Sequence, residues 1–378
     1  MNVLHTLDSL NRGGAEVMEL DVCRNARSAG VDLTFVATGG GDLEADFAES
    51  GSEFIRLQRK LPIDPFLIRE LRKIIIARDI RVVHAHQAVE AIHLYYATRG
   101  TGVKCVMTLH GYITDKKNQL AAKFIIPRMD AVVAVSSSML DWYRTGEGFT
   151  ITDKFHVVLN PVDIERLVST RKQGEMSLRD EFGMSNNAKL LGMIGNFYAD
   201  ARKDQWTVCR ALPRVLKQLP DAHFVFVGSV LDGAEGYQRR CVDHIRENGL
   251  TDRVHFTGKR SDIPDTLREL DLFVFSSVQE GMPIAAIEAL MLGVPMLVSN
   301  IPPLLEVIGE GTIDERCAEV FRTGDADDLA EKILSLFNNE TRLIELSNKA
   351  RKDTPSRFSI QTHLSRIGEL YEQLTTDN

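Results

Sequence analysis

The sequence predicts an α/β protein with two doubly wound domains, each built on a parallel sheet. Short apolar runs alternate with segments of helical period along nearly the whole chain, which is the pattern of parallel βα units. The alternation restarts near residue 189 after a polar stretch. A chain of 378 residues also exceeds what one ordinary core accommodates. We therefore expect two domains of similar size that face each other across a cleft.

In the first half, apolar runs predict strands and the segments between them predict helices. The strands are expected at Val3–Leu7, Leu33–Thr38, Glu53–Leu57, Val82–His86, Val103–His110 and Ala131–Ser136. The helices are expected at Ala15–Ala29, Asp42–Glu49, Pro65–Ala77 and Glu90–Thr98. The polar stretch Ser169–Met184 indicates the interdomain crossing, so we place the first domain at residues 1–166.

The second half repeats the pattern, and we place its domain at residues 167–356. Strands are expected at Lys189–Gly195, His223–Val227, Val254–Thr257, Leu272–Phe275 and Pro295–Val298. Helices are expected at Gln205–Gln218, Gly236–Asn248, Ile263–Leu270, Pro283–Leu292 and Asp328–Phe337. A last amphipathic helix, Ile360–Leu374, lies in the closing segment 357–378.

Composition excludes several classes of protein. Hydrophobic residues make up 44% and charged residues 26%, as in soluble globular proteins. A net charge of −8 argues against a general nucleic-acid binder. The five cysteines are scattered and form no C-x-x-C pair, which fits a reducing cytoplasm better than a zinc site or a disulfide framework. The sequence shows neither a signal-like start nor a membrane-spanning run, so we expect a cytoplasmic protein. We expect it to be a monomer or a homodimer.

The most informative stretch runs from Phe273 to Glu306. An apolar strand stops at Ser276-Ser277, and Glu280 then opens an apolar helix that carries Glu288. The carboxyl end of a parallel strand and the amino end of the next helix form one crevice edge, where helix N–H groups suit a phosphate. Glu288 lies about two helical turns beyond Glu280, so both carboxylates can reach one extended ligand. Two glutamates at this spacing also occur by chance, so the surrounding motif decides the interpretation.

Ser-x-x-Glu-Gly-x-Pro after a buried strand, followed by Glu-Ala-Leu and Gly-Val-Pro, resembles the retaining glycosyltransferases of the family-four group, which have the GT-B fold. The resemblance implies that Glu280 contacts the transferred sugar and that Glu288 binds the ribose hydroxyls. It also implies that the turn holds the donor diphosphate and that the last helix crosses back onto the first domain. The turn residues concerned are Gly281, Met282, Pro283 and Ile284.

Two features of the first half fit this family. Gly13-Gly14-Ala15-Glu16 follows the first strand, and glycines there let the backbone approach a ligand closely. The resemblance places Gly14 beside the donor phosphates. His110 ends the strand VMTLHG, and its counterpart in the family contacts the donor sugar. His84 and His86 stand at an equivalent strand end, and we expect them to shape the acceptor side or the core.

A basic turn follows the first strand of the second domain. Arg202 and Lys203 can neutralise a leaving diphosphate without a metal, although a solvated basic turn is the usual role of such a pair. In the family an Arg usually stands where this chain has Asn196, and a Gly where it has Asp204. These departures weaken Asn196 as a charge-bearing site and favour Arg202 as its substitute, while Asn196 itself is still expected to bind the donor. The resemblance also implies that Arg260, which follows another strand, lies near the nucleotide base.

Three further segments bear on whether the protein contacts a metal ion or a membrane. Asp325-Ala326-Asp327 has the D-x-D form of a metal motif but precedes a helix, where Asp is a preferred cap, so we expect no metal and no cofactor. The segment Lys116–Arg128 interleaves cations with apolar residues, as does the cluster around Arg69–Arg78. Either can contact an anionic membrane or a lipid-linked acceptor, and an ordinary half-buried helix is an equal alternative.

The sequence as a whole predicts a retaining, metal-independent glycosyltransferase that moves a hexose or N-acetylhexosamine from a nucleotide-diphosphate sugar. UDP-sugars are favoured and GDP-mannose comes next. The acceptor is expected to be a saccharide or a lipid-linked saccharide of bacterial surface polysaccharide or glycolipid synthesis, bound by the first domain. A sugar-nucleotide 2-epimerase of the same fold and a non-catalytic nucleotide-sugar-binding module remain alternatives.

Overall fold

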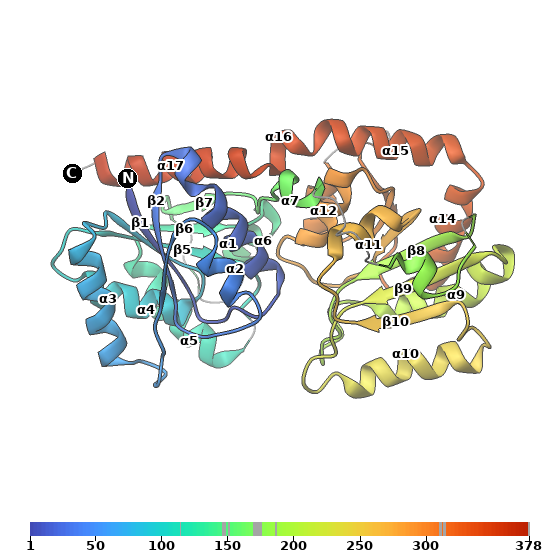
Figure 1. Cartoon of the computed structure of the whole chain (residues 1–378), viewed down its shortest axis with the longest axis horizontal. Helices are drawn as coiled ribbons and strands as arrows, with labels where there is room; N and C mark the ends of the chain where they lie inside the picture. The colour runs from blue at the N-terminus through green and yellow to red at the C-terminus, as the bar shows by residue number, and fades with distance from the viewer. Residues whose placement is uncertain are drawn as a thin grey trace. The chain divides into compact units, whose positions relative to one another are not determined.

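The computed structural model describes residues 1–113, 115–145, 149, 152–168, 176–185, 187–309, 312 and 315–376 (Figure 1). The chain divides into two compact units. Unit 1 comprises Met1–Asp163 together with Arg357–Asn378, and unit 2 comprises Ile164–Ser356.

Unit 1 is built on a parallel sheet of seven strands in the order β3-β2-β1-β4-β5-β6-β7. The strands are β1 (Asn2–Leu7), β2 (Asp32–Ala37), β3 (Glu53–Arg56), β4 (Val82–Ala85), β5 (Lys104–Leu109), β6 (Ala131–Ala134) and β7 (Phe155–Val157). Their residues are mostly buried, as expected for a parallel sheet covered on both faces. The register sets His5 of β1 opposite His84 of β4, so two histidines meet in the middle of the sheet.

The helices of unit 1 follow the strands in βα order. They are α1 (Gly14–Asn25), α2 (Glu44–Ala48), α3 (Pro65–Ala77), α4 (Ala88–Thr98), α5 (Lys116–Ile125), α6 (Ser137–Thr145) and α17 (Ile360–Thr376). Asp64 caps α3 by accepting from the N–H groups of Phe66 and Leu67. The last helix, α17, belongs to this unit as predicted, and the N–H of Val162 donates to the carbonyl of Phe358 just before it (Figure 1).

Unit 2 has a parallel sheet of six strands in the order β10-β9-β8-β11-β12-β13. The strands are β8 (Lys189–Ile194), β9 (Ala222–Val227), β10 (Val254–Gly258), β11 (Leu272–Phe275), β12 (Met296–Ser299) and β13 (Glu319–Phe321). β8 and β11 are neighbours in the sheet although β9 and β10 lie between them along the chain, so the loops that follow β8 and β11 begin at the same sheet edge. In an open α/β sheet such a reversal of strand order marks the ligand crevice.

The helices of unit 2 enclose this sheet. They are α7 (Ile164–Val168), α8 (Leu178–Glu181), α9 (Gln205–Gln218), α10 (Glu235–Glu247), α11 (Ile263–Glu269), α12 (Ile284–Leu292), α13 (Pro302–Ile308), α14 (Ala326–Phe337) and α15 (Glu340–Asp353), and α16 (Pro355–Phe358) leads back to unit 1. Phe224 and Phe226 of β9 lie in the main core with the buried residues of α9 and α14. Gly192 is required at the β8 centre, because a Cβ there would lie 2.8 Å from Leu270 Cδ2.

Most predicted elements are present within one or two residues of their expected ends, and the fold prediction is confirmed. β7 and β13 were not predicted, because strands of three residues at a sheet edge show no alternation. α13 was also not predicted; it begins at Pro302-Pro303, and proline is tolerated in the first turn of a helix. All five cysteines are free and buried. No described helix is both long and apolar enough to cross a bilayer.

Candidate functional site

The loop after β8 is held in place mainly by its backbone. Gly195 N–H donates to the carbonyl of Val227, and Gln205 Nε2 donates to the carbonyls of Gly195 and Asn196 at 3.2 Å. The side-chain oxygen of Asn196 accepts from the N–H of Ser229 at 2.9 Å. Asn196 therefore positions the loop in this structure. A Cβ on Gly195 would lie 3.3 Å from Lys203 Cδ, so glycine leaves room for the lysine stem.

Lys203 and Glu280 form a half-buried ion pair at the carboxyl ends of β8 and β11. Lys203 Nζ lies 2.6 Å from Glu280 Oε1, and the two side chains are only 14% and 10% exposed. The ammonium also lies 4.4 Å from the centroid of the Phe275 ring, a cation–π contact. The two residues predicted from separate motifs thus share one site.

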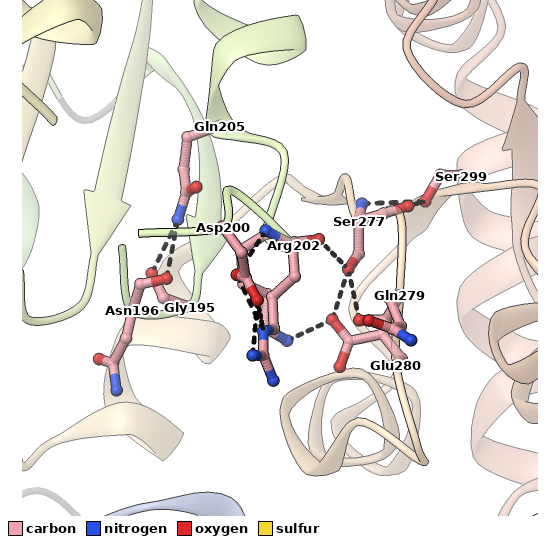
Figure 2. Close-up of polar contacts among 10 residues, drawn as sticks. Gly195, Asn196, Asp200, Arg202, Gln205, Ser277, Gln279, Glu280 and Ser299 are labelled. Carbon is pink, nitrogen blue, oxygen red and sulfur yellow. Dashed lines mark hydrogen bonds and ion pairs between the residues drawn. The ribbon is translucent and has the colours of Figure 1, made fainter. Parts of the chain in front are cut away.

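Ser277 holds Glu280 from the other side (Figure 2). Its hydroxyl lies 2.6 Å from Glu280 Oε1 and 2.7 Å from the carbonyl of Arg202, so its single proton can go to either acceptor. The Ser277 N–H donates to Ser299 Oγ, and that hydroxyl donates back to the Ser277 carbonyl. Lys203 and Ser277 also pair as an antiparallel bridge. The carboxylate is therefore oriented before any ligand arrives.

The guanidinium of Arg202 forms an ion pair with the carboxylate of Asp200. Its Nε lies 3.0 Å from both oxygens of Asp200, and its Nη2 lies 2.6 Å from Oδ2. This bidentate pair lowers the pKa of Asp200 below its ordinary value. The guanidinium also lies over the ring of Tyr198 at 4.9 Å. To give its charge to a phosphate, Arg202 must leave Asp200.

Helix α12 carries the second glutamate. It begins after Pro283 without a side-chain cap, and the αL glycine Gly293 ends it. Glu288 is 4% exposed, and Arg166 Nη2 donates to its Oε1 at 2.8 Å. Removing Arg166 would leave the buried Glu288 carboxylate without this ion pair, which is strongly destabilising. The sequence analysis missed Arg166, which lies 122 positions away on α7.

The turn that joins Glu280 to α12 has the predicted composition. Met282 and Ile284 are buried, at 4% and 8% exposure, so their side chains anchor the turn. Gly281 lies between Glu280 and Met282 and offers no side chain to block a ligand. Uncapped helix N-termini carry a partial positive charge, so this turn suits an anion.

Arg260 is occupied by two carboxylates. Its Nε and Nη2 donate to Asp262 at 2.9 and 2.7 Å, and its Nη1 donates to Glu181 at 2.8 Å. The hydrogen bonds to Asp262 contribute most to the rise in the pKa of the guanidinium. The structure thus gives Arg260 a role in joining α8 to the loop after β10, and its predicted contact with a base stays a prediction.

In unit 1, the glycine motif begins helix α1. Gly14 is the first residue of α1 and is exposed, whereas Glu16 lies half-buried over Gly13. A Cβ on Gly13 would lie 2.5 Å from Glu16 Oε2, so a larger residue there would displace this carboxyl group. Burial raises the pKa of Glu16 to about 7, and the nearby charge of Asp8 adds to the rise.

His110 lies at the end of β5 in a group of histidines. His86 Nδ1 and His110 Nε2 are 2.8 Å apart, and the two rings are stacked. His84 and His86 are buried, so both belong to the core of the unit. His5, His84 and His86 lie close enough to hold a metal ion, but every one of their ring nitrogens already faces another polar partner.

Two family models match consecutive parts of this chain. Residues 12–166 match the model "Glycosyltransferase Family 4", and residues 177–353 match "Glycosyl transferases group 1". Together they cover most of both units, including the glycine motif, the basic turn and both glutamates. The chain belongs to the family-four glycosyltransferases.

Similar proteins agree with this assignment. The glycosyltransferase is 27% identical over 325 residues to the N-acetyl-alpha-D-glucosaminyl L-malate synthase of Bacillus anthracis, covering 84% of this chain and 81% of that protein. It is 24% identical to the UDP-Gal:alpha-D-GlcNAc-diphosphoundecaprenol alpha-1,3-galactosyltransferase of Escherichia coli, covering 80% and 77%.

Solved structures share the GT-B fold with this glycosyltransferase. Anabaena HepE, in complex with UDP and glucose, superposes with a TM-score of 0.82 at 20% identity and covers 98% of this chain and 99% of its own. A glycosyltransferase from Rickettsia africae gives a TM-score of 0.85 at 20% identity, with 100% and 99% covered. At this identity the likeness establishes the fold alone.

The D-x-D segment of the glycosyltransferase is a helix cap, as predicted. Asp325 accepts from the N–H groups of Asp327 and Asp328 at 3.1 and 3.0 Å, at the start of α14. These backbone hydrogen bonds, chiefly that from Asp328, lower the pKa of Asp325. The carboxylate that resembled a metal ligand thus satisfies the first turn of a helix.

The raised pKa of Glu16 predicts a pH-dependent stability of unit 1. Between pH 4.5 and about 7 the unfolded chain releases the Glu16 proton while the folded unit retains it. The stabilising contribution is therefore complete below pH 4.5 and is lost as the pH rises through about 7. We expect Glu16→Gln to gain stability relative to wild type as the pH is raised from 5 to 8.

Chemical denaturation at both pH values measures this change. The two proteins must be compared as a difference, because the histidines of unit 1 titrate in the same range with the opposite sign. Burial lowers their pKa values, so their contribution rises with pH. A difference between Glu16→Gln and wild type that stays constant from pH 5 to 8 would contradict the prediction.

Proposed function

We propose that this glycosyltransferase moves a hexose or N-acetylhexosamine from a UDP-sugar to a saccharide or lipid-linked saccharide acceptor, with retention of anomeric configuration and without a metal ion. The observation that carries the proposal is the Lys203–Glu280 pair beside the uncapped start of α12. The E. coli relative uses a UDP-sugar by its name, and HepE was crystallised with UDP and glucose. GDP-mannose is the second candidate donor, since a mannosyltransferase is among the relatives.

Lys203 is the proposed substitute for a metal ion at the leaving group. A preorganised ammonium in a half-buried site stabilises the charge that develops on the departing diphosphate. Glu280 is the carboxylate that pairs with Lys203 among the described residues, so an arriving phosphate competes with this acceptor for the ammonium. The N–H groups at the start of α12 add a partial positive charge on the same anion. Arg202 adds a second cation if it leaves Asp200.

Glu280 and Glu288 divide the recognition of the donor in this proposal. Glu280 orients the transferred sugar, and Glu288 accepts from the ribose hydroxyls while Arg166 Nη2 donates to its Oε1 at 2.8 Å. Glu280 Oε1 lies within 2.6 Å of both Lys203 and Ser277, so its charge is already engaged and it is a poor nucleophile. We therefore favour a displacement on one face of the sugar, in which the leaving phosphate helps to deprotonate the acceptor.

The proposal is tested by nucleotide release from a panel of UDP-, GDP- and ADP-sugars, with EDTA and without it. Wild type and Glu280→Gln are compared with and without a simple sugar acceptor and a lipid-linked one. We expect release from one UDP-sugar, dependent on acceptor, unchanged by EDTA and strongly reduced in Glu280→Gln. Release that EDTA abolishes would refute metal independence. A sugar trapped covalently on Glu280 would refute the one-face displacement.

Peripheral membrane contact is proposed for α5 in unit 1. The helix buries Ala122 and Ile125 but leaves Leu120 69% and Phe124 36% exposed, beside exposed lysines. An apolar edge among cations is the composition that anionic lipid surfaces attract. The proposed acceptors include lipid-linked saccharides, which such a surface would bring within reach.

Vesicle flotation tests this contact. Wild type should float with vesicles of phosphatidylglycerol and phosphatidylcholine, and reversal of Lys116, Lys117 and Lys123 to Glu should abolish flotation. The matched control reverses three exposed cations of unit 2, Lys217, Arg239 and Lys352, and should float as wild type does. Wild type that stays unbound, or a control that is lost equally, would count against α5.

A further inference from the structure

One arginine of the basic turn in unit 2 has its backbone and its side chain on different partners. The carbonyl of Arg202 accepts from the N–H of Val278 at 2.9 Å and lies 2.7 Å from the Ser277 hydroxyl. Both of these partners lie in the loop after β11. The guanidinium instead reaches back to Asp200, two residues earlier in the chain (Figure 2). The backbone of Arg202 is therefore fixed in the candidate site, while its charge is engaged elsewhere.

The backbone between these two charged residues has an uncommon conformation. Ala201 has a φ of +53°, in the left-handed region that alanine enters only at a cost in free energy. Its N–H donates to the carbonyl of Tyr198 at 3.0 Å. The N–H of Arg202 donates to Asp200 Oδ1 at 3.2 Å, so the carboxylate holds both the backbone and the guanidinium of this residue. A strained residue of this kind persists where its surroundings require the conformation, and such residues gather at functional sites.

The two cations of the basic turn are held with different firmness. The side chains of Lys203 and Glu280 are 14% and 10% exposed, so little water screens their attraction. The side chains of Arg202 and Asp200 are 42% and 52% exposed, and such a pair contributes little net free energy because water competes for both groups. Arg202 is therefore the cation that changes partner easily, whereas Lys203 stays in the site.

The guanidinium of Arg202 lies near enough to the site to interact with an anion there. Hydrogen bonds to Asp200 raise the pKa of Arg202 most, and the charge of Glu280 adds a smaller rise, so the group already lies in the electric field of Glu280. A guanidinium pairs with a carboxylate and with a phosphate in the same two-pronged geometry. A diphosphate carries more charge than one carboxylate, and the start of α12 attracts the same anion. A diphosphate at the site is therefore a stronger partner for the guanidinium than Asp200 is.

We propose that Asp200 is a competing counter-ion for Arg202, so that the guanidinium pairs with Asp200 when no nucleotide is bound and with the diphosphate when a nucleotide is bound. Asp200 thereby weakens the binding of the nucleoside diphosphate and speeds its release after the sugar has been transferred. This inference deepens the proposed function, on which the identity of the ligand rests. Asp200 acts through Arg202 and does not contact the substrate, so it is a positioning residue.

Direct repulsion is the alternative explanation for an effect of Asp200 on an anionic ligand. A carboxylate near a diphosphate lowers its affinity by charge alone, whether or not an arginine stands between them. The two explanations differ in their dependence on Arg202. An effect that acts through Arg202 disappears when this arginine is replaced, whereas repulsion by Asp200 remains. A double-mutant cycle on the two residues therefore separates them.

The test is calorimetric titration of the full-length protein with UDP. Wild type is compared with Asp200→Asn, Arg202→Gln and the double variant. Asparagine keeps the side-chain oxygen that accepts from the Arg202 N–H but carries no charge. We expect Asp200→Asn to bind UDP about three- to fivefold more tightly than wild type, and Arg202→Gln to bind it about tenfold more weakly. In the Arg202→Gln background, the Asp200→Asn substitution should have no further effect.

Asp243 provides a matched control in the same unit. It forms an ion pair with Arg246 on α10, so Asp243→Asn makes the same change in net charge and also frees one arginine. This variant should bind UDP as wild type does. Thermal melting shows whether each variant keeps its fold. If Asp200→Asn does not fold, Asp200→Ser replaces it, because a serine hydroxyl also accepts from a nearby backbone N–H.

Equal affinities of wild type and Asp200→Asn for UDP would overturn the inference. Tighter binding that persists when Arg202 is also replaced would overturn it as well, because the effect would then be repulsion. Either result leaves the proposed function standing, since wild type still binds the nucleotide. If wild type and all variants bind neither UDP nor GDP, the proposed function itself is refuted, and the inference with it.

The dissociation rate of the nucleotide tests the predicted effect on release. Affinity differences between variants of one site lie mostly in this rate. A fluorescent UDP analogue, displaced by excess UDP in a stopped-flow instrument, should leave Asp200→Asn about three- to fivefold more slowly than wild type. Faster association with an unchanged dissociation rate would show that Asp200 only repels the approaching nucleotide, and would overturn the exchange of Arg202.

Discussion

Replacing Lys203 by Met lowers kcat by about 10²- to 10³-fold, the effect expected when one preorganised charge on a leaving group is lost. Methionine keeps an unbranched apolar stem against Phe275 and over Gly195, so the packing of the loop should be preserved. What is removed is the ammonium 2.6 Å from Glu280. The loss should appear in kcat more than in KM, because the charge on the diphosphate grows as the glycosidic bond breaks.

Steady-state kinetics with the active donor measures this loss. Lys217→Met is the matched control, since Lys217 is exposed on α9 and should leave kcat unchanged. Thermal melting of both variants shows whether the fold is retained. If Lys203→Met is folded and turns over at the wild-type rate, Lys203 takes no part in the reaction. The proposed function would then lose the observation on which it rests.

Gly228→Ala destabilises unit 2 by about 3 kcal/mol, through steric overlap and backbone strain together. A Cβ at this position would lie 2.3 Å from the carbonyl oxygen of Gly195 and 2.9 Å from the nitrogen of Asn196. Both are backbone atoms of the loop before Lys203, so neither can rotate away. Gly228 also has a φ of +153°, which side chains rarely adopt. The loop and the ion pair that depends on it should shift with the backbone.

Alanine substitutions at two other glycines of unit 2 distinguish steric overlap from backbone strain. Gly233 has a φ of +82° but its nearest neighbour would be 3.5 Å away, so Gly233→Ala should cost only the left-handed strain of about 1–2 kcal/mol. Gly236 is the second residue of α10 and lies in open space with no φ constraint, so Gly236→Ala should be neutral or slightly stabilising.

Denaturant unfolding is followed by the fluorescence of Trp206, which lies in unit 2. The Trp142→Phe background removes the other tryptophan of the chain, which lies in unit 1. The order of stability should be Gly236→Ala, then Gly233→Ala, then Gly228→Ala. Equal midpoints for the last two would show that the loop yields to the extra methyl group.

Much of the fold could be predicted from local patterns. The apolar run Leu272–Phe275 and the helix after Pro283 are present as expected, because burial on a parallel sheet requires continuous apolar runs and helices require their own period. Turn chemistry worked equally well, since Asp325 caps α14 and Gly293 ends α12. The missed elements include short edge strands such as β7, which owe their shape to a neighbour, and the helices α6, α13 and α15.

The candidate site was predictable only in part. Lys203 and Glu280 were each assigned from the motif around them, and the structure brings them together because β8 and β11 are neighbours in the sheet. Arg202 and Arg260 were expected to serve the donor, yet the structure pairs both with carboxylates. A basic residue in a turn shows that charge is available, but its partner depends on which loops the sheet places side by side.

Local residue order was therefore enough to specify the strands, the helices, their caps and the types of residue at the crevice edge, because these depend on periods and offsets of a few residues. Tertiary contacts alone decided which groups meet: Arg166 with Glu288 across 122 positions, and His5 with Tyr371 across 366. The physical reason is that a buried charge or ring nitrogen must find a partner in space. That partner is supplied by the order of the strands in the sheet and by the packing of α17 on unit 1. No local pattern encodes either of these.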